Sequence, residues 1–197
     1  MKTVVSRMQG FFTEHLLEAG CDEAGRGPLA GPVLAAAVIL PRNFRLPGLD
    51  DSKKLNEKIR LSLEELIKEQ ALAWAVASCS PLEIDQLNIL QASIRAMHRA
   101  VDLLCLRPEF ILADGNRFKP YPFIPHQCFV KGDARFASIA AASILAKNER
   151  DRIMRQLALE FPGYGWEHNM AYPTARHRQA IRDLGITPHH RKSFRLQ

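Results

Sequence analysis

The chain has 197 residues, which suits a single domain that buries a hydrophobic core without disulfides. Its 27 Lys and Arg residues against 21 Asp and Glu residues give a formal charge of +6, which favours a polyanionic partner such as nucleic acid about as much as it favours simple solubility. The four cysteines form no CxxC pair and the first twenty residues hold no uninterrupted apolar stretch, so the sequence argues against a disulfide scaffold, a secreted protein and a membrane protein, and predicts a cytoplasmic one.

The predicted strands come first in the chain. An apolar segment ending in Asp22-Glu23 leads through a glycine-rich turn into the continuous apolar run 31–40, and this pattern predicts a hairpin over about residues 17–40. A third strand is expected near residues 71–79, and shorter strands at 110–114 and 127–131. The sequence therefore predicts five strands.

Two apolar stripes with helical spacing lie between these strands, and both are expected to face the core. The first consists of Ile59, Leu63, Leu66 and Ile67, and the second of Leu90, Ile94, Met97, Val101 and Leu104. Residues 80–83, Ser-Pro-Leu-Glu, have the form of a capping box with proline at the first helical position, which predicts a helix start directly after the third strand.

The last predicted elements are a long helix and a short one. The long helix is expected from Ala134 to about Leu159, and its small residues 140–143 allow close packing. Residues 175–184 are typical of a short helix that Gly185 ends. The element order predicts an α/β fold with a mixed sheet in a single domain, 1–197, made of a core of about residues 15–160 and an extension of about residues 161–197.

Four acidic residues stand at or near the ends of predicted strands: Asp22, Glu23, Asp114 and Asp133. Carboxylates crowded in a partly buried place repel one another, so each favours its neutral form unless a cation compensates. Because these ligands are hard oxygen donors without Cys or His, the pattern indicates Mg²⁺ or Mn²⁺ and hence phosphate chemistry.

Each acid also has an ordinary structural interpretation. Asp133 directly before a helix is typical of an N-cap, and Asp114-Gly115 is typical of a plain turn. Taken singly, these interpretations are favoured, whereas Asp22 and Glu23 have no obvious structural use on opposite faces of an apolar strand. The predicted metal site therefore depends on the convergence of all four acids.

The turn Gly25-Arg26-Gly27 offers backbone N–H groups and a guanidinium to phosphate or sugar oxygens, although a hairpin turn with a solvated arginine explains it equally well. The next glycine comes one residue late for a dinucleotide-binding loop, and a strand follows instead of a helix, so that interpretation is rejected.

Other basic and aromatic residues are expected mainly at the surface. Some basic residues could bind phosphates, but most are expected to be solvated: Lys53, Lys54, Lys147, Arg150, Arg152, Arg191 and Lys192. Four histidines lack zinc-site spacing and are expected at the surface or as weak phosphate contacts: His168, His177, His189 and His190. Tyr172 before Pro173 is more often a packing residue, although an exposed ring could stack on a sugar or base.

Taken in order, these segments resemble ribonuclease HII over about residues 17–194. The matching segments are residues 21–28, 51–55, 112–115, 131–133, 139–147, 172–174 and 190–194. The resemblance implies a ribonuclease H-like five-stranded mixed sheet flanked by helices, with a carboxyl-terminal helical extension. It also implies that the catalytic and metal-binding residues are Asp22, Glu23, Asp114 and Asp133.

The same resemblance implies how substrate is bound. The Gly25-Arg26-Gly27 turn would sense the 2′-hydroxyl at an RNA-to-DNA junction, Tyr172 would stack on the neighbouring deoxyribose, and Lys54 counts among the substrate-binding residues. One departure is Met170-Ala171 before that tyrosine, where the family usually has Lys-Gly or a similar pair.

The implied activity is cleavage of the RNA strand of RNA/DNA hybrids, and nicking on the 5′ side of ribonucleotides embedded in duplex DNA. This hydrolysis would use Mn²⁺ or Mg²⁺ and leave 3′-hydroxyl and 5′-phosphate ends. The resemblance places the activity in ribonucleotide excision repair and DNA replication, carried out by a cytoplasmic monomer.

Three alternatives compete with this family. Polynucleotidyl transferases and junction resolvases place acids on the same kind of sheet, but the Gly25-Arg26-Gly27 turn argues against them. Ribonuclease HIII normally carries an additional amino-terminal domain, for which the residues before Asp22 are expected to leave no room. A non-catalytic binder of hybrid duplexes, with acids that hold only a structural ion, is disfavoured by the intact quartet.

Overall fold

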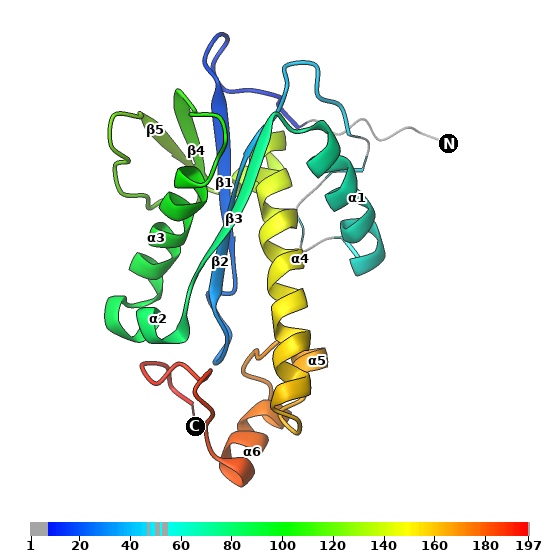
Figure 1. Ribbon diagram of the computed structural model, residues 1–197, viewed down its shortest axis with the longest axis vertical. Coiled ribbons are helices and arrows are strands. Elements are labelled where there is room, and N and C mark those ends of the chain that lie inside the picture. The colour runs from blue at the N-terminus through cyan, green and yellow to red at the C-terminus, as the bar shows by residue number, and fades with distance from the viewer. Residues whose placement is uncertain (1–7, 47, 50–51, 53–54, 197) are drawn as a thin grey trace.

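Five strands form one mixed sheet in the computed structural model, which describes residues 8–46, 48–49, 52 and 55–196. The order across the sheet is β3-β2-β1-β4-β5 (Figure 1). The central strand β1 pairs antiparallel with β2 and parallel with β4, while β3 and β5 form the two edges. The bounds are β1 Glu18–Ala24, β2 Val33–Ile39, β3 Ala73–Cys79, β4 Phe110–Asp114 and β5 His126–Phe129. The predicted five-stranded mixed sheet is confirmed.

Helices cover both faces of this sheet, as Figure 1 shows. One face is covered by α1 (Glu57–Gln70) and the long helix α4 (Ala137–Glu160), and the other by α2 (Pro81–Leu87) and α3 (Ile89–Asp102). A short 3₁₀ turn η1 (Gly132–Ala134) precedes α4, and the short helices α5 (Trp166–Asn169) and α6 (Ala175–Leu184) follow it. No helix in the described ranges is long and apolar enough to span a bilayer.

Strand β2 has a continuously apolar sequence because every one of its residues is buried. Ala36 and Val38 pack against α1 and α4, while Ala35 and Ala37 pack against α3. A strand covered on both faces has no position left for a polar alternation. The two cores therefore lie on opposite sides of one central strand pair.

The long helix α4 lies unusually close to β1. Its residues 137–146 are all buried, and most of them are alanine or serine. A Cβ atom added at Gly20 of β1 would overlap the backbone of Ser138. The predicted close packing of the 140–143 segment is confirmed, and Gly20 is the residue on the sheet that makes room for it.

The predicted core face of α1 is only half correct. Leu63 and Ile67 are buried, but Ile59 and Leu66 are 43% and 36% exposed. The helix is turned because two charged residues, Arg60 and Glu64, face inward instead. Arg60 Nη2 lies 3.0 Å from Asp151 Oδ2, and Asn148 Nδ2 donates to Glu64 Oε2 over 2.8 Å, so buried polar partners on α4 take the place of an apolar stripe.

The stripe of α3 agrees better with expectation, since Ile94, Met97 and Val101 are buried and Leu90 and Leu104 are partly buried.

The predicted capping box at Ser80 and the ordinary interpretation of Asp133 as an N-cap have opposite outcomes. The capping box at Ser80 is confirmed, because Glu83 N–H donates to Ser80 Oγ and Ser80 N–H donates to Glu83 Oε2. The long helix, however, begins at Ala137 with Phe136 as its uncapped N-cap residue. Asp133 lies inside the 3₁₀ turn, so its interpretation as an N-cap is wrong.

The carboxyl-terminal segment packs against the far end of α4 and against residues 29–31. Its centre is Trp166, which is fully buried with Tyr164, Met154 and Ile181. The backbone of Gly31 donates to His189 O over 2.9 Å and that of Arg191 donates to Leu29 O over 2.9 Å, so the last residues run beside the turn that follows β1.

Candidate active site

Asp22 and Asp114 lie side by side at the carboxyl ends of adjacent parallel strands. The register of β1 and β4 pairs Cys21 with Ala113, so the next residue on each strand is an aspartate. Residues at matching positions of parallel strands point to the same side. Asp22 receives a hydrogen bond from Ser143 of α4, which places this pair on the α4 side of the sheet.

Asp133 is held near Asp22 and Asp114 by its neighbour in the chain, Gly132. The backbone N–H of Gly132 donates to Asp114 Oδ1 over 2.7 Å, and Asp133 is buried in the 3₁₀ turn that connects β5 to α4. Gly132 itself is closely surrounded, because an added Cβ would meet Ile139 at 2.6 Å. The turn therefore holds the backbone beside Asp133 against Asp114.

Glu23 reaches the site from the other side of β1. It lines a small pocket of about 130 Å³ together with Asp114, and α3 supplies the apolar wall. The remaining polar lining comes from Arg26, Asn116 and Arg117. Asp114 thus borders both the Asp22 side and the Glu23 side of the sheet edge.

The electrostatics of Asp22 match the repulsion expected from the sequence. Burial raises the pKa of this carboxyl well above its usual value, and the negative charges of Glu23 and Asp114 raise the pKa further. The Ser143 hydroxyl and the Glu23 N–H, which donates to Asp22 Oδ1 over 2.7 Å, act in the opposite direction. In the part of the chain that the structure describes, no Lys, Arg or His forms an ion pair with Asp22 or Asp114. Asp22 and Asp114 are therefore neighbouring acids whose charges oppose each other.

A divalent cation fits this donor set by charge and by ligand type, since all four candidate ligands are carboxylates. Among the described residues, no three His, Cys, Asp or Glu side chains are already grouped closely enough to hold a metal ion. Strand register brings two of the four acids together, the 3₁₀ turn places Asp133 next to them, and Glu23 approaches from the opposite face.

Ser143 was missed as a site residue by sequence reasoning. Its hydroxyl bonds to Asp22 and lowers the pKa of that carboxyl, and it also lies 2.7 Å from the Ser52 hydroxyl. Asn116 and Arg117 were also missed. All three lie within or directly after segments already singled out, at 139–147 and 112–115, and that proximity was the available signal.

The predicted substrate-binding residues also come together. Gly25 has a φ of +97°, which favours glycine, and the Arg26 side chain is 51% exposed with Nη1 3.4 Å from Glu23 Oε1. Tyr172 is 44% exposed, and its ring would be 3.5 Å from a Cβ atom on Gly27. Arg26 therefore lies beside Glu23, and the tyrosine ring lies beside the next residue of the turn, Gly27. Lys54 and Lys53 lie outside the described residues.

Two arginines that were expected to be solvated are buried. Arg150 of α4 and Arg191 near the carboxyl terminus are 1% and 0% exposed. Arg191 donates to backbone carbonyl groups of the turn, and Arg150 donates to those of Ala30 and Met170 in the neighbouring loops. The expectation of a solvated surface is wrong for these two residues.

The surface prediction is also wrong for two histidines. Trp166 donates its indole N–H to Nε2 of His177 over 2.9 Å, so Nδ1 of His177 carries the proton and donates to Tyr172 O over 3.1 Å. Thr187 N–H donates to Nδ1 of His190 over 2.9 Å, so the proton of His190 is on Nε2, which faces His177 Nε2 at 3.3 Å. Burial lowers the pKa of both imidazoles, that of His190 to about 4. His177 therefore holds the backbone carbonyl of Tyr172, and His190 packs behind it.

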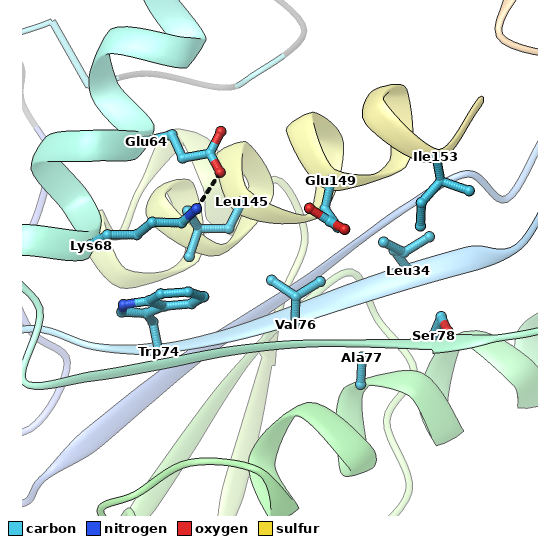
Figure 2. Close-up of a pocket in the computed structure, with 10 residues that line it drawn as sticks. All are labelled: Leu34, Glu64, Lys68, Trp74, Val76, Ala77, Ser78, Leu145, Glu149 and Ile153. Carbon is cyan, nitrogen blue, oxygen red and sulfur yellow. Dashed lines mark hydrogen bonds and ion pairs between the residues drawn. The ribbon is translucent and has the colours of Figure 1, made fainter. Parts of the chain in front are cut away.

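A larger groove of about 350 Å³ lies elsewhere, between α1, α4 and the edge strand β3 (Figure 2). Its apolar floor includes Trp74 and Val76, and the Lys68–Glu64 ion pair crosses one end. None of the four acids and no residue of the glycine turn lines it. Despite its size, this groove lacks the groups that the predicted chemistry needs, so the candidate site is the acidic edge of the sheet.

Comparison with known proteins gives consistent matches along the chain. The sequence model of the family described as Ribonuclease HII matches residues 19–197. A ribonuclease HII of Parabacteroides distasonis is 61% identical over 180 residues, which cover 91% of this chain and 90% of that protein. The crystal structure of the ribonuclease H2 from Pyrococcus horikoshii OT3 has a TM-score of 0.77 at 26% identity, with 91% of this chain and 94% of that one covered.

A second solved structure gives the same picture. It is the complex of PCNA and RNase HII from Archaeoglobus fulgidus, whose matching chain has a TM-score of 0.77 at 27% identity. The match covers 92% of this chain and 96% of that one. The likeness therefore extends over the sheet, the flanking helices and most of the carboxyl-terminal extension.

Proposed function

The chain belongs to the ribonuclease HII family, and from this membership we propose how its active site works. The protein is a metal-dependent endonuclease that acts on the RNA of RNA/DNA hybrids. The proposal concerns which residues carry out the reaction, which ions they bind and how a ribonucleotide is recognised. The observation that carries it is the register of β1 and β4, which sets Asp22 beside Asp114 directly before the arginine turn.

We assign the metal site to Asp22, Glu23, Asp114 and Asp133, with Mg²⁺ or Mn²⁺ as the ion. When bound, such an ion stabilises negative charge on the scissile phosphate and lowers the pKa of water. The chain's own contribution is to hold the carboxylates in place: Ser143 donates to Asp22, and Gly132 N–H donates to Asp114. Supporting polar contacts of this kind orient ligands in metal sites generally.

Recognition of the sugar is assigned to the exposed residues next to these acids. A 2′-hydroxyl is what separates RNA from DNA at a given position, and it can both donate and accept a hydrogen bond. The Gly25-Arg26-Gly27 turn presents a guanidinium beside Glu23, and the Tyr172 ring lies against Gly27, where it can stack on the next sugar. Lys54 is assigned to the substrate backbone on its place in the family-like segment 51–55.

On this assignment the enzyme nicks the strand on the 5′ side of a ribonucleotide embedded in duplex DNA and leaves 3′-hydroxyl and 5′-phosphate ends. It acts as a monomer with a single domain, in which residues 161–197 complete the binding surface by contributing Tyr172. Ribonucleotide excision repair and DNA replication in the cytoplasm are the processes that such an activity serves.

The test is a cleavage assay on three duplexes of one sequence: all-DNA, DNA with one ribonucleotide, and a full RNA/DNA hybrid. Each is incubated with Mg²⁺, Mn²⁺ or a chelator, and the product ends are analysed. The proposal requires cleavage of the two ribose-containing duplexes only, dependence on the ion, and 5′-phosphate products. A 2′,3′-cyclic phosphate would show that the 2′-hydroxyl, and not water, is the nucleophile.

A further inference from the structure

Arg150 and Arg191 form an unusual pair, because each buried guanidinium is bonded to backbone carbonyl groups. Arg191 donates to Gly25 O over 2.7 Å and to Arg26 O over 3.1 Å, and further to Gly31 O and Pro32 O. Across the described ranges, neither guanidinium forms an ion pair with a carboxylate. Two positive charges are thus held inside the protein by peptide oxygens.

Arg150 connects the same turn to the loop that carries the tyrosine. Its two terminal nitrogens both donate to Met170 O over 3.1 Å, and it also donates to Ala30 O over 3.3 Å and to Pro32 O over 3.4 Å. Its side chain fills the space beneath Gly25, where an added Cβ would overlap the guanidinium. Met170 is two residues before Tyr172. One side chain therefore bridges the turn and the tyrosine loop.

Burying two charged guanidinium groups costs more free energy than a purely structural link between the two loops requires. Burial lowers the pKa of Arg150 to about 10 and that of Arg191 to about 9, and the charge of Arg150 contributes to the second shift. Both groups remain protonated at neutral pH. Well-packed apolar residues often stabilise an interior as well as buried charges do. What apolar residues cannot do is fix several carbonyl groups at set positions, whereas the planar fork of arginine can.

The groups that this pair fixes are the backbones behind the two exposed recognition residues. Arg26 projects outward from the turn whose carbonyls bind Arg191, and Tyr172 projects outward from the loop whose carbonyl binds Arg150. The Tyr172 ring lies against Gly27, so a small shift of either backbone changes the gap between the guanidinium of Arg26 and the ring.

We propose that Arg150 and Arg191 are positioning residues for sugar discrimination: together they hold the Gly25-Arg26-Gly27 turn and Tyr172 at the spacing that accepts a ribose followed by a deoxyribose. This inference deepens the proposed function and rests on it. It predicts that the two arginines affect selectivity for a ribonucleotide more than they affect general binding to duplex DNA.

The test compares Arg150→Lys and Arg191→Lys with the wild-type protein. Lysine keeps the positive charge but offers a single ammonium group, which cannot reach the same set of carbonyls. The matched control is Arg155→Lys, a change at a half-exposed residue of α4 whose side chain pairs with Glu57 of α1 over 2.5 Å. Dissociation constants are measured with Ca²⁺ in place of the catalytic ion, for an all-DNA duplex and for the same duplex with one ribonucleotide.

Selectivity is the dissociation constant of the all-DNA duplex divided by that of the duplex with one ribonucleotide. Arg150→Lys and Arg191→Lys should each lower this ratio by about tenfold or more, while the dissociation constant of the all-DNA duplex changes by less than about threefold. The control variant should keep the wild-type ratio. An unchanged ratio in folded Arg150→Lys and Arg191→Lys proteins overturns the inference, even if their thermal stability falls. A wild-type protein that binds the two duplexes equally overturns the proposed sugar recognition itself, so the two failures are distinguishable.

A measurement on the wild-type protein covers the case in which a lysine variant does not fold. Both arginine Nε–H groups donate to carbonyl groups and are buried, so they should give slowly exchanging signals in protein labelled with ¹⁵N-arginine. These signals should shift when the duplex with one ribonucleotide is added and shift less with the all-DNA duplex. Equal shifts with both duplexes contradict the proposed role.

Discussion

Gly132 donates its backbone N–H to Asp114 Oδ1 over 2.7 Å, and this bond joins the end of β4 to the 3₁₀ turn before α4. Asp133 is the next residue of that turn. An acid from the fourth strand and an acid 19 residues later are thus positioned by one backbone contact, while the register of β1 positions Asp22 on the other side of Asp114.

The first prediction concerns Asp114, which borders both sides of the site. Asp114→Asn keeps the shape of the side chain but removes its charge, so cleavage of a duplex with one ribonucleotide should fall by about a thousandfold or more, while affinity stays within about tenfold. Single-turnover rates and binding titrations measure the two effects separately. Asp102→Asn is the control, because Asp102 lies at the exposed end of α3 and its contact is with Tyr121. Unchanged turnover in Asp114→Asn would place the catalytic site elsewhere.

The second prediction concerns Ser143, whose hydroxyl donates to Asp22. Ser143→Ala removes that bond, and the concentration of Mn²⁺ needed for half-maximal cleavage should rise by about tenfold. Ser138→Ala is the matched control on the same helix, since Ser138 Oγ is buried and has no hydrogen-bond partner among the described residues. Removing that hydroxyl should leave the metal requirement unchanged. If both variants need the same Mn²⁺ concentration as the wild type, Ser143 does not support the site.

The third prediction concerns the dependence of stability on pH. His190 has a pKa of about 4 in the folded protein against an ordinary value of 6.5, because it is buried beside His177. The unfolded chain therefore takes up a proton between these values while the folded chain does not. His190 therefore costs no stability above about pH 6.5, and the free energy of unfolding falls progressively as the pH drops towards 4, by on the order of 3 kcal/mol.

Urea unfolding at a series of pH values measures this loss. His190→Asn keeps a hydrogen-bonding side chain and removes the titration, so the free energy of unfolding should decline less steeply between pH 6.5 and 4. His168→Asn is the control, because His168 is largely exposed and should leave the slope as it is. An equally steep decline in His190→Asn would mean that other groups govern the acid sensitivity.

The fourth prediction concerns the packing of α4 on β1. Gly20→Ala adds a Cβ that overlaps the backbone of Ser138, so the helix must move away from the strand that carries Asp22. The free energy of unfolding should fall by about 3 kcal/mol or more. Gly10→Ala is the control, because no atom of the described residues lies within 4 Å of its Cβ position and the change should stay within about 0.5 kcal/mol. Equal unfolding midpoints for the two variants would contradict the close contact.

Residues close in sequence to an element boundary were the ones that sequence reasoning predicted well. The apolar strand ending in Asp22 and Glu23, the capping box at Ser80 and the strand ending in Asp114 all carry their signal within a few residues. The apolar pattern also indicated which strands pack on both faces, because β2 has no polar residue to point outward.

The errors share a cause, which is that a charged or polar residue finds a partner far away in the chain. Arg60 faces inward because its side chain donates to Asp151, which lies 91 residues later in the chain. Arg150 and Arg191 are buried because the fold brings carbonyl groups of residues 25–32 and 170 to them. His177 is buried because Trp166, 11 residues earlier, and His190, 13 residues later, both contact its Nε2. No local pattern distinguishes such residues from solvated ones.

The central claim is that the four acids share a divalent-metal site that holds the scissile phosphate. The most direct measurement is the anomalous scattering of Mn²⁺ in crystals of the Asp114→Asn protein or the wild type with a duplex that contains one ribonucleotide and an uncleavable linkage. The account predicts that wild-type crystals show manganese among Asp22, Glu23, Asp114 and Asp133 next to that linkage, with the peak weakened in Asp114→Asn. Manganese bound away from these carboxylates, with the linkage elsewhere on the surface, would contradict it.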